Sequence, residues 1–149
     1  MPKASVKRLI DCKKEQLIDL VLDIEKYPEF VPFCLGSKIY EKKDKGDQLL
    51  IIADLTIGKG PFKDTYKSDV KFYKNEDSIY VTNLDGPLKH LENKWHFKEI
   101  NNLSEVSFEI DFELKNDFLN IIMTKSFQFG LDKIADAFQK RAEELFSKA

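Results

Sequence analysis

The chain has 149 residues, of which 42% are hydrophobic and 34% charged, and this composition excludes an intrinsically disordered protein. A chain of this length is expected to form one domain, residues 1–149, that buries roughly 68–70% of its unfolded surface without help from metals or disulfides. The 24 basic and 26 acidic residues give a net charge of −2, which offers no overall attraction for nucleic acid, so we expect no DNA partner. The 12 phenylalanines raise the question whether the rings fill a solid core or line a cavity.

The N-terminus and the two cysteines indicate the cellular compartment of the protein. Residues 1–8 run into charged sequence without the apolar stretch of about 7–15 residues that a secretory signal needs. The densest apolar run, 49–53, is far shorter than the roughly 18 residues of a membrane span. Cys12 and Cys34 are too few for a disulfide framework and are expected to be reduced thiols. We therefore expect a cytoplasmic protein.

The first part of the chain predicts a strand, a short helix and an irregular segment. After a strand at 4–10, apolar residues recur at i, i+3, i+4 and i+7 within residues 13–24, which predicts a helix capped by Asp11. Tyr27-Pro28 is expected to end this helix. The following segment, 27–34, holds apolar rings between two prolines and cannot be a regular strand or a long helix.

Beyond this segment the apolar period changes to two, and short turns separate successive strands. The expected strands are 37–43, 48–57, 62–73, 78–84, 90–99 and 105–114. A long helix then begins at Asn116-Asp117 and runs to about residue 147, which makes it on the order of 45 Å long. The element order is β-α-β-β-β-β-β-β-α.

This order predicts an α+β fold with an antiparallel sheet of six to seven strands, because the turns are too short for parallel connections. Such a sheet is about 30 Å wide, whereas one helix covers only about 10–12 Å. The sheet must therefore curve strongly around the long C-terminal helix, with the short helix closing one end. A sheet curved around so narrow a helix leaves room for an internal cavity.

Strand and helix periodicity identifies the residues expected to face this interior. They are Ile51, Ala53, Leu55, Tyr66, Val81, Leu91, Trp95, Phe97, Phe108, Ile110, Phe112, Phe127, Leu131, Ile134 and Phe138. We assign Phe30, Val31, Phe33 and Leu88 to its mouth, since Phe30 and Phe33 do not fit an ordinary core. Both a solid core and an apolar ligand cavity are consistent with this set.

Polar residues interrupt the apolar interior. Asp64 and Ser68 share a face with apolar neighbours, and Asn93 lies between Leu91 and Trp95. Buried polar groups need partners, so these side chains bond one another, bond water, or contact the polar head of a ligand.

The final helix carries apolar residues on a second side near its start. Phe118, Ile122 and Phe129 lie opposite the main apolar stripe. Two interpretations remain open: packing under a neighbouring loop, or an exposed patch for a bilayer, a partner or a second protomer.

No catalytic or metal-binding pattern is evident, and we expect no catalytic residues and no metal. His90 and His96 lie on the same side of a strand, and His96 is expected to face water, with no carboxylate or thiol at ligand spacing to either histidine. The acidic residues of the last strand, Glu105, Glu109, Asp111 and Glu113, read as a solvated face.

Four segments carry a family resemblance. They are YPEFVPFCLGS at 27–37, DGPLKHLENKWHF at 85–97, residues 106–114, and AFQKRA at 137–142. The chain resembles the START-like helix-grip superfamily and, within it, the ubiquinone-binding (coenzyme Q-binding) family that also contains the bacterial RatA proteins. It departs from the family pattern at Phe33, where Trp is usual, and at Leu88, where Phe is usual, and these changes bear on ligand shape more than on fold.

The resemblance implies a protein that binds ubiquinone or a related polyprenyl quinone without catalysis, supports respiratory electron transport, and associates peripherally with the inner membrane. Its alternative implication is a RatA-type inhibitor that binds the large ribosomal subunit, for which a local basic end, Lys3, Lys7, Arg8, Lys13 and Lys14, is available. A polyketide-cyclase-like enzyme is a third reading, disfavoured because no acid/base pair occupies the expected pocket. Fold alone does not choose among these.

Overall fold

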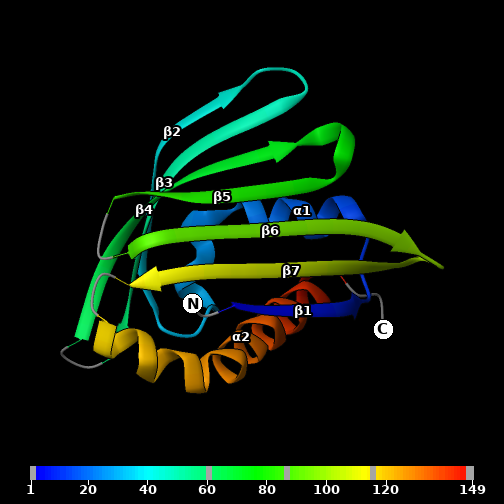
Figure 1. Ribbon diagram of the computed structural model, residues 1–149. Coiled ribbons are helices and arrows are strands. Elements are labelled where there is room, and N and C mark those ends of the chain that lie inside the picture. Colours follow the sequence, from blue (N-terminus) through cyan, green and yellow to red (C-terminus); the bar gives the residue numbers. More distant parts are fainter. Residues whose placement is uncertain (1–2, 60–61, 86–87, 115–116, 147–149) are drawn as a thin grey trace.

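The computed structural model describes residues 3–59, 62–85, 88–114 and 117–146, with side chains described for 3–58, 65–84, 89–113 and 130–146. Helices and strands follow the expected order (Figure 1). The elements are β1 (Lys3–Ile10), α1 (Lys14–Leu22), the 3-10 helix η1 (Ile24–Glu29), β2 (Cys34–Asp44), β3 (Gln48–Lys59), β4 (Phe62–Tyr73), the 3-10 turn η2 (Lys74–Glu76), β5 (Ser78–Asp85), β6 (Leu88–Ile100), β7 (Leu103–Leu114) and α2 (Asp117–Phe146). The α+β prediction is confirmed.

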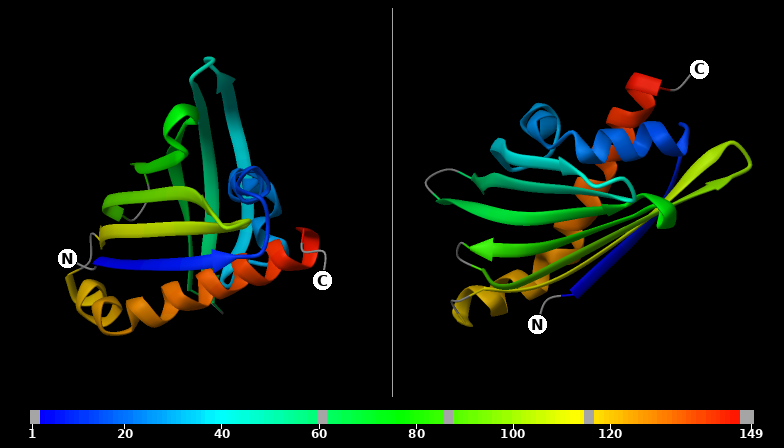
Figure 2. Two further views of the ribbon diagram at one scale, coloured as in Figure 1. Left: turned by 90° about the vertical axis from the view of Figure 1, so that its right-hand side faces the viewer. Right: turned by 90° about the horizontal axis from the view of Figure 1, so that it is seen from above.

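The seven strands form one antiparallel sheet in the order β1-β7-β6-β5-β4-β3-β2. Strands β2 to β7 are joined by short turns, whereas α1 and η1 carry the chain from β1 at one edge to β2 at the other. In the left view of Figure 2, β2 to β4 run across the direction of β6, β7 and β1, so the sheet is strongly curved. The two helices lie on its concave side, and the contacts of α2 with the sheet are mainly with β1.

The start of α1 differs from the prediction. Asp11 does not cap the helix; the N-cap is Lys13, whose backbone N–H donates to the Gln16 side-chain oxygen at 3.0 Å. The backbone N–H of Asp11 instead donates to the Glu143 carboxylate on α2 at 3.4 Å. The Gln16 side chain, at the third position of the helix, thus satisfies the backbone N–H of the N-cap residue, as in a capping box.

The end of α1 also differs. The helix stops at Leu22, and Tyr27-Pro28 lies within η1 rather than at a helix end. The fixed φ of proline is compatible with a 3-10 turn, and the Tyr27 hydroxyl donates to the Val21 carbonyl, which ties η1 back to α1. As predicted, the proline-containing segment forms neither a strand nor a long helix.

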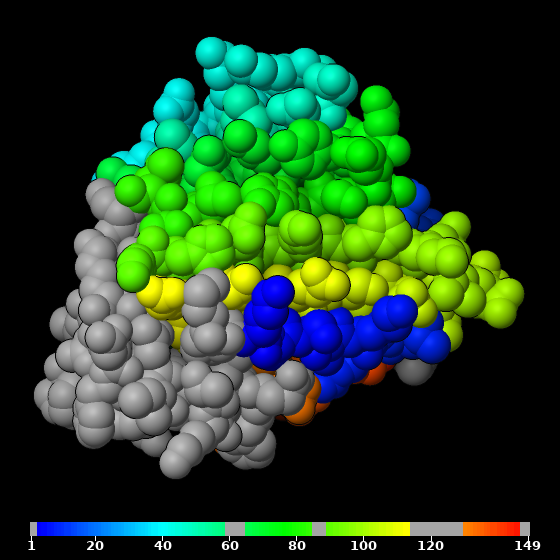
Figure 3. Space-filling view, in the orientation of Figure 1, coloured from blue at the N-terminus to red at the C-terminus, as the bar shows by residue number. Residues whose placement is uncertain are grey.

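One hydrophobic core lies between the concave face, α1 and the C-terminal half of α2. Its buried members are Ile10, Cys12, Leu17, Ile18, Leu20, Val21, Leu22, Ile24, Ile51, Ala53, Val70, Ile79, Val81, Phe97, Val106, Phe138 and Ala142. Figure 3 shows the opposite side of the sheet, where side chains of β5, β6, β7 and β1 form a continuous outer surface. The sheet thus has an apolar concave face and a polar convex face.

Candidate functional site

An aromatic cluster closes the concave face beneath the C-terminal half of α2. The Phe138 ring contacts Tyr27, Phe30 and Trp95 edge to face, with centroid separations of 5.4, 5.1 and 5.5 Å. Trp95 also lies 4.3 Å from the ring of Phe108. Such contacts stabilise by about 0.5–1.5 kcal/mol each beyond the area that they bury. The prediction that Phe30 stands apart from the core is therefore wrong: its ring packs on a helix 108 residues away in sequence, a contact that local spacing cannot reveal.

The other predicted site residues, of the interior, the mouth and the helix patch, fall into three groups. The structure buries Ile51, Ala53, Ser68, Val81, Phe97, Phe108, Phe112, Leu131 and Phe138. It leaves partly exposed Val31, Leu55, Tyr66, Leu91, Asn93, Trp95, Ile110 and Ile134. The side chains of Asp64, Leu88, Phe118, Ile122, Phe127 and Phe129 lie outside the described residues.

Phe33 lies at the rim of the sheet, just before β2. Its side chain is 42% exposed and its φ is +65°, a left-handed conformation that bulky residues rarely adopt. Leu35 and Ile57 are also exposed, and they belong to the same end of the β2–β3 pair, where Cys34 pairs with Ile57 and the Gly58 N–H donates to the Phe33 carbonyl at 2.9 Å. We call Phe33, Leu35 and Ile57 the apolar edge patch.

A short polar strip crosses the concave face of β4, β5 and β6. Ser68 is 7% exposed, and its register partner is Asn83, whose side-chain oxygen accepts from the Leu91 N–H at 3.1 Å. On β6, the Asn93 Oδ1 atom is buried and has no hydrogen-bond partner among the described residues. The sequence reasoning identified Ser68 and Asn93 but missed Asn83, although it alternates in phase with Ile79 and Val81.

The buried ionisable groups that the structure describes remain neutral. Burial raises the pKa of the Cys12 and Cys34 thiols, and burial likewise raises the pKa of Tyr27 far above its ordinary value. Because the thiolate is the nucleophile, neither cysteine is activated for covalent chemistry. Both thiols are free, as expected.

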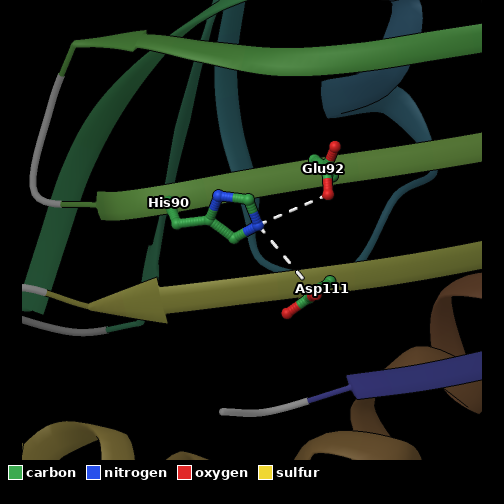
Figure 4. A group of neighbouring side chains, drawn as sticks. All are labelled: His90, Glu92 and Asp111. Atoms are coloured by element: carbon green, nitrogen blue, oxygen red, sulfur yellow. Dashed lines mark ion pairs between the residues drawn. The ribbon is translucent and has the colours of Figure 1, made fainter.

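The convex face carries a group that the sequence reasoning excluded. His90 and Glu92 on β6 and Asp111 on β7 offer ligand atoms that all lie within 4.8 Å of one another (Figure 4). The statement that no carboxylate lies at ligand spacing to the histidines is therefore wrong. Glu92 is two residues from His90 on the same face, and the β6–β7 register places Asp111 opposite Glu92.

An open groove of about 380 Å³ lies next to this group, on the same strands. Its lining comprises Tyr73, Glu76, Ser78, Ile79, Tyr80, Lys94, Trp95, His96, Ser107 and Glu109.

Residues 10–139 match the model of a family described as polyketide cyclase / dehydrase and lipid transport. The chain belongs to this family. It is 34% identical over 138 residues to a mitochondrial coenzyme Q-binding protein of Dictyostelium discoideum, covering 90% of this chain but only 65% of that protein. It is 30% identical over 148 residues to the ribosome association toxin RatA of Escherichia coli K12, covering 99% of this chain and 90% of that protein. The expected kinship with coenzyme Q-binding and RatA-type proteins is confirmed.

Solved structures confirm the START-like fold. A START superfamily protein from Mycobacterium smegmatis superposes with a TM-score of 0.81 at 20% identity, covering 96% of this chain and 98% of that chain. The Zhui aromatase/cyclase from Streptomyces also has a TM-score of 0.81, at 12% identity, covering 95% of this chain and 93% of that chain. At these identities the similarity speaks for the fold alone. Among the described helices, none is long and apolar enough to cross a membrane.

Proposed function

We propose that this chain is a non-catalytic binding protein for ubiquinone or a related polyprenyl lipid, held against the concave face. The observation that carries the proposal is the buried Oδ1 of Asn93, which has no hydrogen-bond partner among the described residues and belongs to a short polar strip on a mainly apolar face. A buried acceptor without a donor is costly, and a water or the hydroxyl of a reduced (quinol) head that donates to it removes that cost. Apolar walls with a few fixed polar groups are typical of small-molecule sites.

Two kinds of residue on the concave face would recognise different parts of the ligand. Rings and aliphatic side chains such as Phe108 and Ile110 would bury an isoprenoid tail, at about 25 cal/mol per Å², without selecting its head. The amide of Asn93 would recognise the head, because its NH₂ group donates to a quinone carbonyl and its oxygen accepts from a quinol hydroxyl. Ser68 and Asn83 lie on neighbouring strands and would complete the polar contact.

The absence of catalysis in this proposal rests on the chemistry of the concave face. Its described polar groups are hydroxyls and amides, and the nearby thiols are held neutral by burial. General acid/base catalysis needs a group that titrates near the working pH. Because an aromatase/cyclase shares this fold, enzymatic activity is the competing interpretation.

Delivery to a membrane would use the apolar edge patch. Phe33, Leu35 and Ile57 expose apolar surface at one rim of the sheet, where a polyprenyl chain passing between bilayer and concave face would emerge. A cytoplasmic protein that docks transiently on the inner membrane in this way would carry or position the quinone for respiratory electron transport.

Ribosome binding of the RatA type is the second candidate, favoured by the 30% identity over nearly the whole chain. The basic end expected to serve it is partly neutralised. Lys3, Lys7, Arg8 and Lys14 each pair with a carboxylate, namely Asp111, Glu105, Asp136 and Asp77 respectively. Paired cations attract phosphates less, so we rank lipid binding first.

The test is the organic extract of the protein purified from its native host, analysed by mass spectrometry. We expect stoichiometric polyprenyl quinone, and about tenfold less of it in Asn93→Leu, which removes one buried hydrogen bond of roughly 1.4 kcal/mol. Lys94→Ala, on the next residue but the convex face, is the matched control and should retain wild-type quinone. Lipid-free protein that co-sediments with large ribosomal subunits would overturn the proposal.

A further inference from the structure

Three side chains on the convex face converge on one point. His90 Nε2 lies 3.5 Å from Glu92 Oε2 and 3.9 Å from Asp111 Oδ2 (Figure 4). Ligands that bind a zinc ion tetrahedrally at about 2.1 Å lie roughly 3.4 Å from each other. Both separations are close to that value, so a metal ion could enter with small side-chain movements.

Neighbouring contacts orient the Glu92 carboxylate. The Tyr80 hydroxyl donates to Glu92 Oε1, which leaves Oε2 directed at His90. Outer contacts of this kind fix the ligands of protein metal sites.

The backbone contributes to the orientation of the other two side chains. The β6–β7 register shifts between Leu88 and His90, and such irregularities redirect the following side chain. Asp111 faces Glu92 directly across the two strands. All three residues therefore belong to regular, hydrogen-bonded strands rather than to loops.

The negative charge of the Glu92 and Asp111 carboxylates is incompletely balanced by nearby lysines. Asp111 Oδ1 is buried and has no hydrogen-bond partner among the described residues, and Oδ2 lies 3.9 Å from the ammonium of Lys3, whose side chain is 76% exposed. Two other lysines of β6 make contacts outside the group: Lys89 pairs with Glu113 at 3.0 Å, and Lys94 lies over the Tyr80 ring. A cation would supply the missing positive charge and displace only a weakly held lysine.

The geometry points to a divalent transition-metal site, of zinc type, formed by His90 Nε2, Glu92 Oε2 and Asp111 Oδ2. One imidazole and two carboxylates suit zinc, and three protein ligands leave a fourth position for water. Tyr80 both orients Glu92 and lines the open groove, so this fourth position lies close to the end of that groove. The site is independent of lipid binding on the concave face.

The experiment is a zinc titration of the tag-free full chain against a chromophoric chelator, with thermal unfolding in zinc and in EDTA as a second readout. We expect one ion per chain and a melting temperature raised by zinc. His90→Ala and Asp111→Asn should each weaken binding at least tenfold and abolish the zinc-dependent rise. Tyr80→Phe should weaken binding by a smaller factor, because it removes only the orienting bond.

His96→Ala is the matched control, because His96 lies on the same strand and the same face but outside the group. It should bind zinc within twofold of the wild type. Equal weakening by His96→Ala and His90→Ala, or no saturable binding by wild-type protein that is folded by circular dichroism, would overturn the site. Variants that melt like the wild type in EDTA are folded, and unchanged quinone content in His90→Ala separates this test from that of lipid binding.

Discussion

The two faces of strand β6 place different chemistry one residue apart. On the concave side Phe97, Trp95 and Asn93 pack or turn toward the helices, and the one polar group there is neutral and without a partner. On the convex side His96, Lys94 and Glu92 are accessible, and Glu92 accepts a bond from a tyrosine and faces a histidine. Period-two alternation thus gives one strand two faces of different chemistry, so the proposed lipid and metal sites do not touch each other.

The largest expected contrast between the faces is in stability. Phe97 is 1% exposed, and Phe97→Ala should lower the free energy of unfolding by about 3–5 kcal/mol through lost burial and a residual cavity. His96→Ala, on the neighbouring residue of the convex face, should change it by less than about 0.5 kcal/mol. Urea unfolding measures both. Similar losses from the two variants would show that the faces are not energetically distinct.

Two serines on β7, one on each face, allow the same comparison of stability with a smaller expected difference. Ser104 is fully buried and its hydroxyl donates to the Cys12 carbonyl at 2.7 Å. Ser104→Ala should therefore cost about 1–3 kcal/mol, because the carbonyl is left without its donor in the interior. Ser107→Ala on the convex face should be nearly neutral. A neutral Ser104→Ala variant would mean that water replaces the lost hydroxyl.

The rim between helix and sheet is expected to show an intermediate effect. Arg141 on α2 donates to Glu29 at 2.8 Å and its guanidinium lies 5.2 Å from the centre of the Phe30 ring. Arg141→Lys keeps the charge but loses the planar contact, so we expect a loss of about 1 kcal/mol in thermal or urea unfolding. Lys140→Ala, on the adjacent exposed residue, is the control and should be neutral.

The smallest expected effect is on the pH dependence of stability. The hydrogen bond from Arg141, together with Lys26, holds the pKa of Glu29 below its ordinary value. A carboxylate whose pKa is lower in the folded state stabilises the protein above its unfolded pKa, and this contribution is lost as the pH falls through the folded pKa. Glu29→Gln should therefore flatten the fall in melting temperature below about pH 5, whereas Glu144→Gln should follow the wild-type curve.

Strand and helix periodicity predicted the order of elements and most of the concave face, because those patterns are local. It could not reveal contacts that depend on which strands become neighbours. The histidine and two carboxylates of the convex face meet only because β6 and β7 pair in the register that sets Glu92 against Asp111. Asn83 is different, because it alternates in phase with Ile79 and Val81, and its place on the concave face follows from the local strand pattern alone.

The contacts of helix α2 explain where the chain uses arginine instead of lysine. The chain has 24 basic residues, and only two of them are arginine. Arg8 reaches from β1 to Asp136, the Asp132 carbonyl and Gln139, while Arg141 reaches from α2 to η1. Arg8 ties the helix to β1 and Arg141 ties it to η1, and a planar guanidinium offers more donors in a fixed geometry than an ammonium does. In this lysine-rich chain, the two arginines therefore occur where the planar shape of the cation, rather than its charge alone, fixes the position of helix α2.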